Sequence, residues 1–146
     1  MNQVVLLDTG PLVAFLNARD RYHAWAKEQL GLLQPPLLTC EAVLSEALFL
    51  LRHRREAQKA VMGLVENGLL RLPFRLEEEA GAVSRLLQRY VEVPMSLADG
   101  CLVRMSEQHD SAVVLTLDSD FAIYRRHRRQ VVPTIRPNRR RAPVTV

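Results

Sequence analysis

The 146-residue sequence lacks the features of a disulfide-rich or membrane-spanning protein. It has only two cysteines, Cys40 and Cys101, without a CxxC pair, which predicts two buried reduced thiols. No apolar run reaches the ~18 residues of a membrane span. The short apolar run at residues 4–7 has no basic residue before it, unlike a signal peptide. We therefore expect a cytoplasmic protein.

Other absences limit the classes of function that the sequence can support. Aromatic residues make up only 5% of the chain, which argues against extensive stacking on nucleic-acid bases. The sequence has no GxxxxGK[ST] loop, which argues against a P-loop nucleotide enzyme. The histidines are scattered, and no Ser–His–Asp or Cys–His set can be assembled from the pattern. They are His23, His53, His109 and His127.

Acidic residues are absent from position 121 to the end, although the whole chain carries a net charge of only +4. The same segment holds eight arginines, and four of them lie between positions 136 and 141. A basic segment beside an acidic body suits a polyanion, because arginine forks match phosphate oxygens. The alternative is a solvated tail kept for solubility. The arginines we predict to contact RNA are Arg125, Arg126, Arg128 and Arg129.

The length and the 48% hydrophobic content fit one globular domain, at residues 1–135, followed by a basic tail at 136–146. Apolar runs predict strands at residues 3–7, 37–38, 69–72, 112–117 and 131–135. Helical spacing predicts helices at 12–17, from Asp20 to the break at Pro35, from Thr39 to 54, and at 56–67, 77–90, 96–109 and 119–127. Alternating strands and helices predict an α/β fold, a parallel sheet with helices on both faces in three α/β/α layers.

Two predicted strands lead into an aspartate. Asp8 follows the run at 4–7, and Asp118 follows the run at 113–117. Ligands bind at the carboxyl ends of parallel strands, so the two carboxylates would share one crevice if their strands are neighbours. Each aspartate could instead be a turn former or a helix cap.

Three further acidic residues point to the same crevice. Glu46 lies mid-helix among apolar neighbours, which predicts burial, and a buried carboxylate requires a partner or a metal. The alternatives are a salt bridge to an arginine and a place at the edge of the apolar stripe. Asp99 stands three residues after Ser96, a capping-box spacing, and capping does not exclude a place in the crevice. Asp120 is a fifth candidate.

Crowded carboxylates repel one another unless a cation or a proton neutralises them. Hard oxygen ligands without cysteine or a histidine cluster favour Mg²⁺ or Mn²⁺ over zinc. Two such ions about 4 Å apart can activate water and stabilise a leaving oxygen in phosphodiester cleavage. The sequence leaves open whether one or two ions bind.

Four segments together resemble the PIN-domain ribonucleases, and within them the VapC-type toxins of toxin–antitoxin pairs. In chain order they are LLDTGPLVAFL, AVLSEALFLL, SLADGCLV and VLTLDSDF. The first and last are the most specific, and the likeness extends to about residue 135. The resemblance implies a sandwiched parallel sheet, an acidic site for Mg²⁺ or Mn²⁺, a homodimer and a small antitoxin partner.

The resemblance also implies roles for individual residues. Asp8, Asp99 and Asp118 would contact metal directly or through water, while Glu46 would orient the attacking water or complete the coordination. Asp120 falls at an accessory acidic position, and Thr9 and Thr116 match hydroxyl residues that support the cluster. Gly100 departs from the alanine that is more usual there, and the arginine-rich tail lies outside the pattern.

Two other functions stay open at this point. A non-catalytic RNA-binding or interaction module on the same fold would have an incomplete or plugged acidic cluster. A DNA-directed nuclease could use the same metal site, because phosphate contacts and metal ions serve both polymers. The sequence identifies neither the RNA nor the cut site.

Overall fold

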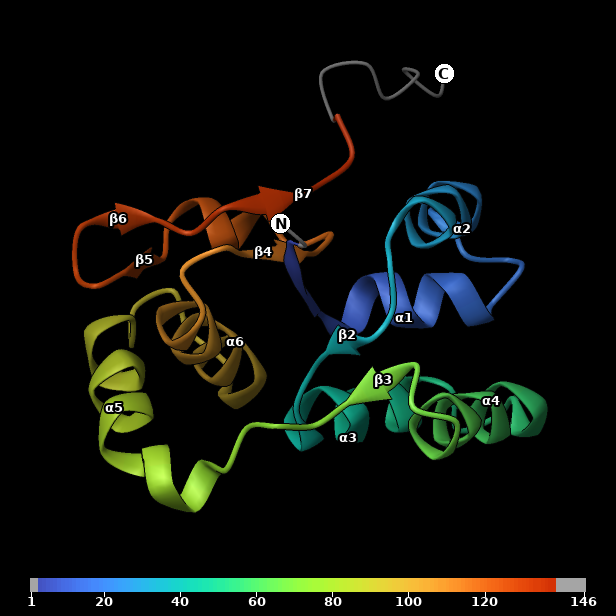
Figure 1. Cartoon of the computed structure of the whole chain (residues 1–146), viewed down its shortest axis with the longest axis horizontal. Coiled ribbons are helices and arrows are strands. Elements are labelled where there is room, and N and C mark those ends of the chain that lie inside the picture. Colours follow the sequence, from blue (N-terminus) through green and yellow to red (C-terminus); the bar gives the residue numbers. More distant parts are fainter. Residues whose placement is uncertain (1–2, 139–146) are drawn as a thin grey trace.

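A five-stranded sheet forms the centre of the computed structural model, which describes residues 3–138 (Figure 1). The strand order is β3-β2-β1-β4-β7, and every neighbouring pair is parallel. The strands are β1 (Val4–Leu7), β2 (Leu37–Leu38), β3 (Leu70–Arg71), β4 (Ala112–Leu115) and β7 (Thr134–Ile135). All five strands predicted from apolar runs are therefore confirmed, with ends that differ by a few residues.

Helices cover both faces of the sheet, which confirms the predicted three-layer architecture. They are α1 (Thr9–Leu16), α2 (His23–Leu32), α3 (Glu41–Leu50), α4 (Arg55–Glu66), α5 (Leu76–Arg89) and α6 (Leu97–Gln108). Because side chains alternate along a strand, β1 feeds two cores. Leu6 packs with α5 and α6, while Val5 and Leu7 pack with α1 and α4. In Figure 1, α5 and α6 lie on one side of the sheet and α1 and α2 on the other.

The predicted helix at 119–127 is wrong. A 3₁₀ turn, η1 (Ser119–Ala122), is followed by an antiparallel hairpin of β5 (Arg125–Arg126) and β6 (Gln130–Val131). The hairpin turns at His127 and Arg128, whose φ angles of 49° and 71° are left-handed. Helical spacing alone could not show this, because the segment carries no glycine or asparagine to mark such a turn.

Two predicted helix caps are also wrong, and one is confirmed. Asp20 accepts from the backbone N–H of Tyr22, before α2 begins. The Thr39 hydroxyl donates to the Leu7 carbonyl at 2.8 Å. It therefore links the end of β1 to the residue that follows β2, and it does not cap α3. Ser96 does cap α6, because its hydroxyl accepts from the Asp99 N–H at 3.0 Å.

Three further predictions concern the two cysteines, membrane-spanning helices and the basic tail. Cys40 and Cys101 are free and buried, as predicted. Within residues 3–138, each helix is too short or too polar to cross a bilayer. The division into a domain at 1–135 and a tail at 136–146 stays a prediction, and three arginines of that tail, at positions 139–141, lie outside the described residues.

Candidate active site

Asp8 lies between the end of β1 and the start of α1, and the residue is 6% exposed. One oxygen accepts from the Thr9 N–H at 2.8 Å, and the other accepts from the Thr116 hydroxyl at 2.6 Å. Its position as N-cap of α1 is favourable for a negative charge, because the helix dipole is positive there. Capping, the simpler interpretation of Asp8, is thus real, and it coexists with a place at the sheet's carboxyl edge.

Asp118 lies three residues beyond the end of β4, later than the predicted strand end. The neighbouring strands β1 and β4 are in register, with Leu7 opposite Leu115. Thr116 connects the two aspartates, because its oxygen donates to Asp8 and accepts from the Asp118 N–H at 2.9 Å. Asp118 in turn accepts from the Asp120 N–H at 2.8 Å, which caps η1. Both aspartates therefore face one edge of the sheet.

Asp99 reaches the same edge from the first turn of α6. It is 8% exposed, and one of its oxygens accepts from the Tyr124 hydroxyl at 2.8 Å. Tyr124 is fully buried just before the β5–β6 hairpin. Tyr124 is not among the site residues predicted from the sequence, because a tyrosine in a segment predicted to be helical gives no sign of contact with Asp99.

Glu46 is exposed, so the expectation that it loses water on folding is wrong. The apolar side chains near it on α3 are not all buried either, since Phe49 is 62% and Leu50 57% exposed. Helical spacing therefore overstated how much of α3 packs. The carboxylate still faces the other acidic residues, because it accepts from the Thr9 hydroxyl at 2.7 Å.

These segments enclose one open pocket of about 470 Å³. All five acidic residues singled out from the sequence line it, together with Thr9 but without Thr116, which lies behind Asp8. The lining residues are Asp8, Thr9, Gly10, Glu46, Leu50, Pro94, Ser96, Asp99, Leu117, Asp118 and Asp120. Segments more than a hundred residues apart in the chain thus contribute carboxylates to a single concave surface.

Burial and mutual repulsion perturb two of these carboxyls. Burial raises the pKa of Asp8 to about 7, against the hydrogen bonds from Thr116 and Thr9, and repulsion from Asp99 and Asp118 adds to the rise. Burial also raises the pKa of Asp99; the Tyr124 hydrogen bond opposes that rise. Asp118 and Glu46 repel Asp99 in the same direction. Perturbed carboxyls that share a pocket are typical of a functional site.

The donor set suits Mg²⁺ or Mn²⁺, because every candidate ligand is a carboxylate or hydroxyl oxygen. Within residues 3–138, however, no three acidic or histidine side chains are already gathered around a single metal position. Several oxygens are held instead by hydrogen bonds from Thr9, Thr116 and Tyr124. The residues fit a divalent ion by chemistry and placement, and the acidic side chains would have to converge further to coordinate it.

The arginines predicted to bind RNA lie elsewhere. Arg125 donates to the carbonyls of three preceding residues, and Arg126 donates to the carbonyls of Ser106 and Asp110. Arg128 and Arg129 are exposed at the hairpin turn, and none of the four lines the acidic pocket. Contact between these residues and RNA stays a prediction.

The Tyr124–Asp99 contact gives a first prediction. Tyr124→Phe should destabilise the protein by about 1–3 kcal/mol near neutral pH, because a buried carboxylate loses a donor. The same change should raise the pKa of Asp99 further, since the hydroxyl now lowers it. Urea denaturation measures the first effect, and the pH titration of the Asp99 carboxyl by NMR measures the second. Tyr22→Phe is the matched control, and equal effects in both variants would contradict the role of the Tyr124 hydroxyl.

The chain matches a known family in sequence and a solved structure in fold. The PIN domain family profile matches residues 5–126. In three dimensions the chain is similar to the crystal structure of Mycobacterium tuberculosis VapC20, described as a sarcin-ricin loop cleaving toxin. The TM-score is 0.74 with 22% sequence identity, over 82% of this chain and 93% of that one. At that identity the likeness shows a shared fold. No curated protein sequence matches the chain.

Proposed function

The chain belongs to the PIN-domain family, and from this premise we propose that it is a Mg²⁺- or Mn²⁺-dependent ribonuclease, the toxin of a toxin–antitoxin pair. The observation that carries the proposal is the pocket into which Asp8, Glu46, Asp99, Asp118 and Asp120 converge from four segments. Such a concentration of acidic groups weakens the fold unless a cation or protons neutralise it. A site kept at that cost is typical of function.

In the proposed mechanism, Asp8, Asp99 and Asp118 would hold the divalent ion, and Asp120 would support them from the turn after Asp118. When bound, the ion supplies charge neutralisation at the scissile phosphate and lowers the pKa of a water molecule. Thr9 and Thr116 fix the carboxylates by hydrogen bonds of 2.7 Å to Glu46 and 2.6 Å to Asp8.

Glu46 has a different place in the pocket. It is exposed at the rim, where its second oxygen is free of the Thr9 bond and can accept a proton from an attacking water. We assign Glu46 the role of orienting that water, whereas the more buried aspartates would bind the ion. Glu46 could alternatively complete the coordination of the ion.

The proposed substrate is RNA, acted on in the cytoplasm. This preference follows the family and the likeness to VapC20, which is described as a sarcin-ricin loop cleaving toxin. A DNA-directed nuclease and a non-catalytic interaction module are the competing functions. Both are outcomes of the cleavage assay described below.

The proposed partners are an antitoxin and a second copy of the chain. Apolar side chains exposed on α3 and α4 support a docking role, since large apolar groups at a surface favour association. Phe49 is 62%, Leu50 57% and Met62 45% exposed. Light scattering at micromolar concentration tests the dimer, and a monomer there would contradict it.

Cleavage of a mixed RNA pool, with Mn²⁺ or with chelator, tests the function. We expect cleavage only with metal, and none of a matched single-stranded DNA. Cleavage of the DNA at the same rate would instead favour the DNA-directed nuclease. No cleavage of either polymer would favour the non-catalytic module.

Glu46→Gln separates catalysis from folding in the same assay. Because Glu46 is exposed, the melting temperature of this variant in chelator should stay within about 2 °C of that of the unsubstituted protein. Cleavage should fall at least tenfold, since the water loses its proton acceptor. Glu41→Gln, at an exposed site on the same helix and outside the pocket, is the control. Full cleavage by Glu46→Gln would remove Glu46 from the mechanism.

A further inference from the structure

A second pocket, separate from the acidic one, lies between α5, α6 and the turn of the β5–β6 hairpin. Its volume is about 380 Å³, and four arginines and one glutamate line it. The charged lining residues are Arg85, Arg89, Arg104, Glu107 and Arg128. It shares no lining residue with the acidic pocket. Its lining therefore carries a net positive charge, whereas the lining of the acidic pocket carries a negative one.

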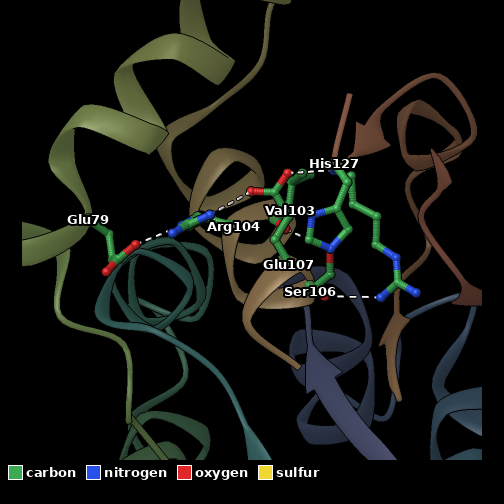
Figure 2. Close-up of polar contacts among 7 residues, drawn as sticks. Glu79, Val103, Arg104, Ser106, Glu107 and His127 are labelled. Carbon is green, nitrogen blue, oxygen red and sulfur yellow. Dashed lines mark hydrogen bonds and ion pairs between the residues drawn. The ribbon is translucent and has the colours of Figure 1, made fainter. Parts of the chain in front are cut away.

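A network of hydrogen bonds fixes the floor of this pocket. Arg104 on α6 donates to Glu79 at 2.7 Å and to Glu107 at 3.0 Å, and Glu107 also accepts from the His127 N–H at 2.7 Å (Figure 2). Arg104 thus has two carboxylate partners, so this network carries one net negative charge. Both oxygens of Glu107 are hydrogen-bonded, and its side chain is only 12% exposed, which limits its contact with an incoming anion.

The same network holds the hairpin turn over the pocket. Arg126 donates to the Ser106 carbonyl at 3.0 Å, and Arg89 donates to the Arg128 carbonyl at 3.0 Å. Arg128 sits at a φ of 71°, which is unfavourable for a residue with a Cβ atom. Glycine or asparagine would satisfy the turn at lower cost, so an arginine there suggests that its side chain is used.

Three guanidinium groups of the pocket lack a neutralising partner. Across residues 3–138, no carboxylate lies within salt-bridge distance of Arg85, Arg89 or Arg128. All three are exposed, and like charges gathered at one hollow repel one another. An anion that bridges them would relieve this repulsion, and guanidinium forks match phosphate oxygens in pairs.

We infer that this arginine pocket binds phosphate groups of the RNA backbone, away from the bond that is cut. The inference deepens the proposed function, because it rests on RNA as the substrate. Arg104 and Glu107 lie five to eight residues beyond Asp99 on α6, which is about 8–12 Å along the helix axis. One rigid helix therefore connects the acidic pocket to the arginine pocket, and fixes the distance between the cut site and the distal phosphates.

Backbone binding, rather than base recognition, fits the lining. Among the described residues, no aromatic side chain lines the pocket, so aromatic stacking on bases is absent from it, and its polar surface comes mainly from residues that suit phosphate groups. The pocket would therefore favour RNA length and geometry over sequence. An acidic protein segment is the competing occupant, and RNA binding that is unchanged in the pocket variant below would favour it.

The test is the double variant Arg85→Gln/Arg128→Gly. Arg85 is exposed on α5, and glycine at position 128 tolerates the positive φ, so the melting temperature should not fall. Binding of a fluorescently labelled single-stranded RNA is measured by anisotropy, in chelator, over a range of salt concentrations. Losing two phosphate contacts should flatten the slope of log affinity against log salt by about 1.4 and weaken binding roughly 10- to 30-fold at 0.1 M salt.

The matched control is Arg55→Gln/Arg71→Gln, which removes the same charge from exposed sites outside the pocket. It should keep most of the affinity and slope. If both double variants lose equal affinity, or if neither does, the inference is wrong. Because the assay contains chelator, it reports on the pocket independently of cleavage, so a failure of the ribonuclease proposal is detected separately by the metal-dependent cleavage assay.

Discussion

Replacing Asp8 with asparagine is expected to abolish RNA cleavage and, at the same time, to stabilise the metal-free protein above neutral pH. The carboxyl is buried beside Asp99 and Asp118, and its pKa is raised from 3.8 to about 7. Asparagine has the shape of the neutral acid and never ionises. It keeps an oxygen for the Thr9 N–H and an amide group that can donate to Thr116, but it cannot supply a charged metal ligand.

The direction of the pH effect follows from proton binding. The folded protein holds a proton on Asp8 more tightly than the unfolded chain does, so this proton stabilises the fold fully below about pH 3.8. That stabilisation is lost as the pH rises through about 7. A shift of about three pKa units corresponds to roughly 4 kcal/mol. In chelator at pH 8, Asp8→Asn should therefore melt roughly 8–16 °C higher, with a much smaller difference at pH 4.

Melting curves in chelator across this pH range, together with cleavage assays in Mn²⁺, measure both parts of the prediction. Asp110→Asn is the control, because Asp110 is an exposed aspartate outside the pocket. Added Mn²⁺ should raise the melting temperature of the unsubstituted protein and of the control, but not of Asp8→Asn. A variant that is less stable at pH 8 and still responds to Mn²⁺ would refute the role of Asp8.

Thr116→Val is expected to destabilise the protein by about 2–4 kcal/mol at pH 8 and to slow cleavage about 10²-fold. Thr116 is fully buried, and its oxygen both donates to Asp8 and accepts from the Asp118 N–H. Valine fills the same space without either bond. The loss should be smaller at pH 5, because the hydrogen bond from Thr116 lowers the pKa of Asp8 and is strongest for the ionised carboxylate.

Thr116→Ser provides the matched comparison, since it keeps the hydroxyl and removes only a methyl group. It should restore most of the cleavage rate and the pH dependence of stability. If serine and valine behave alike, the effect comes from packing, and Thr116 does not position the acidic residues.

Local sequence was sufficient to predict the strands of the central sheet and some of the residues at its edge. Short apolar runs predicted the five strands of the sheet, because a strand buried on both faces needs continuous apolar residues. Asp8 could be placed at the sheet edge for the same reason, since the turn that ends β1 directly follows four apolar residues. Ser96 could be predicted as a cap because its bond to the Asp99 N–H spans only three residues.

The positions of residues that depend on distant contacts could not be predicted in the same way. Glu46 is exposed because α3 leaves part of its apolar side uncovered by the neighbouring helices, which helical spacing does not reveal. Tyr124 contacts Asp99 across 25 residues. The hairpin that replaces the predicted helix at 119–127 is anchored to α6 through Glu107 and Ser106.

The sequence by itself thus determined the order of strands and helices up to Asp118 and the carboxylates available to the site, because these depend on neighbours within a few residues. Tertiary structure alone decided that the carboxylates share one pocket and that the arginines form another. Charge patterning along the chain suggested a basic tail. The arginine pocket instead combines Arg85, Arg104 and Arg128 from two helices and a hairpin, since packing α5 against α6 brings distant residues to one surface.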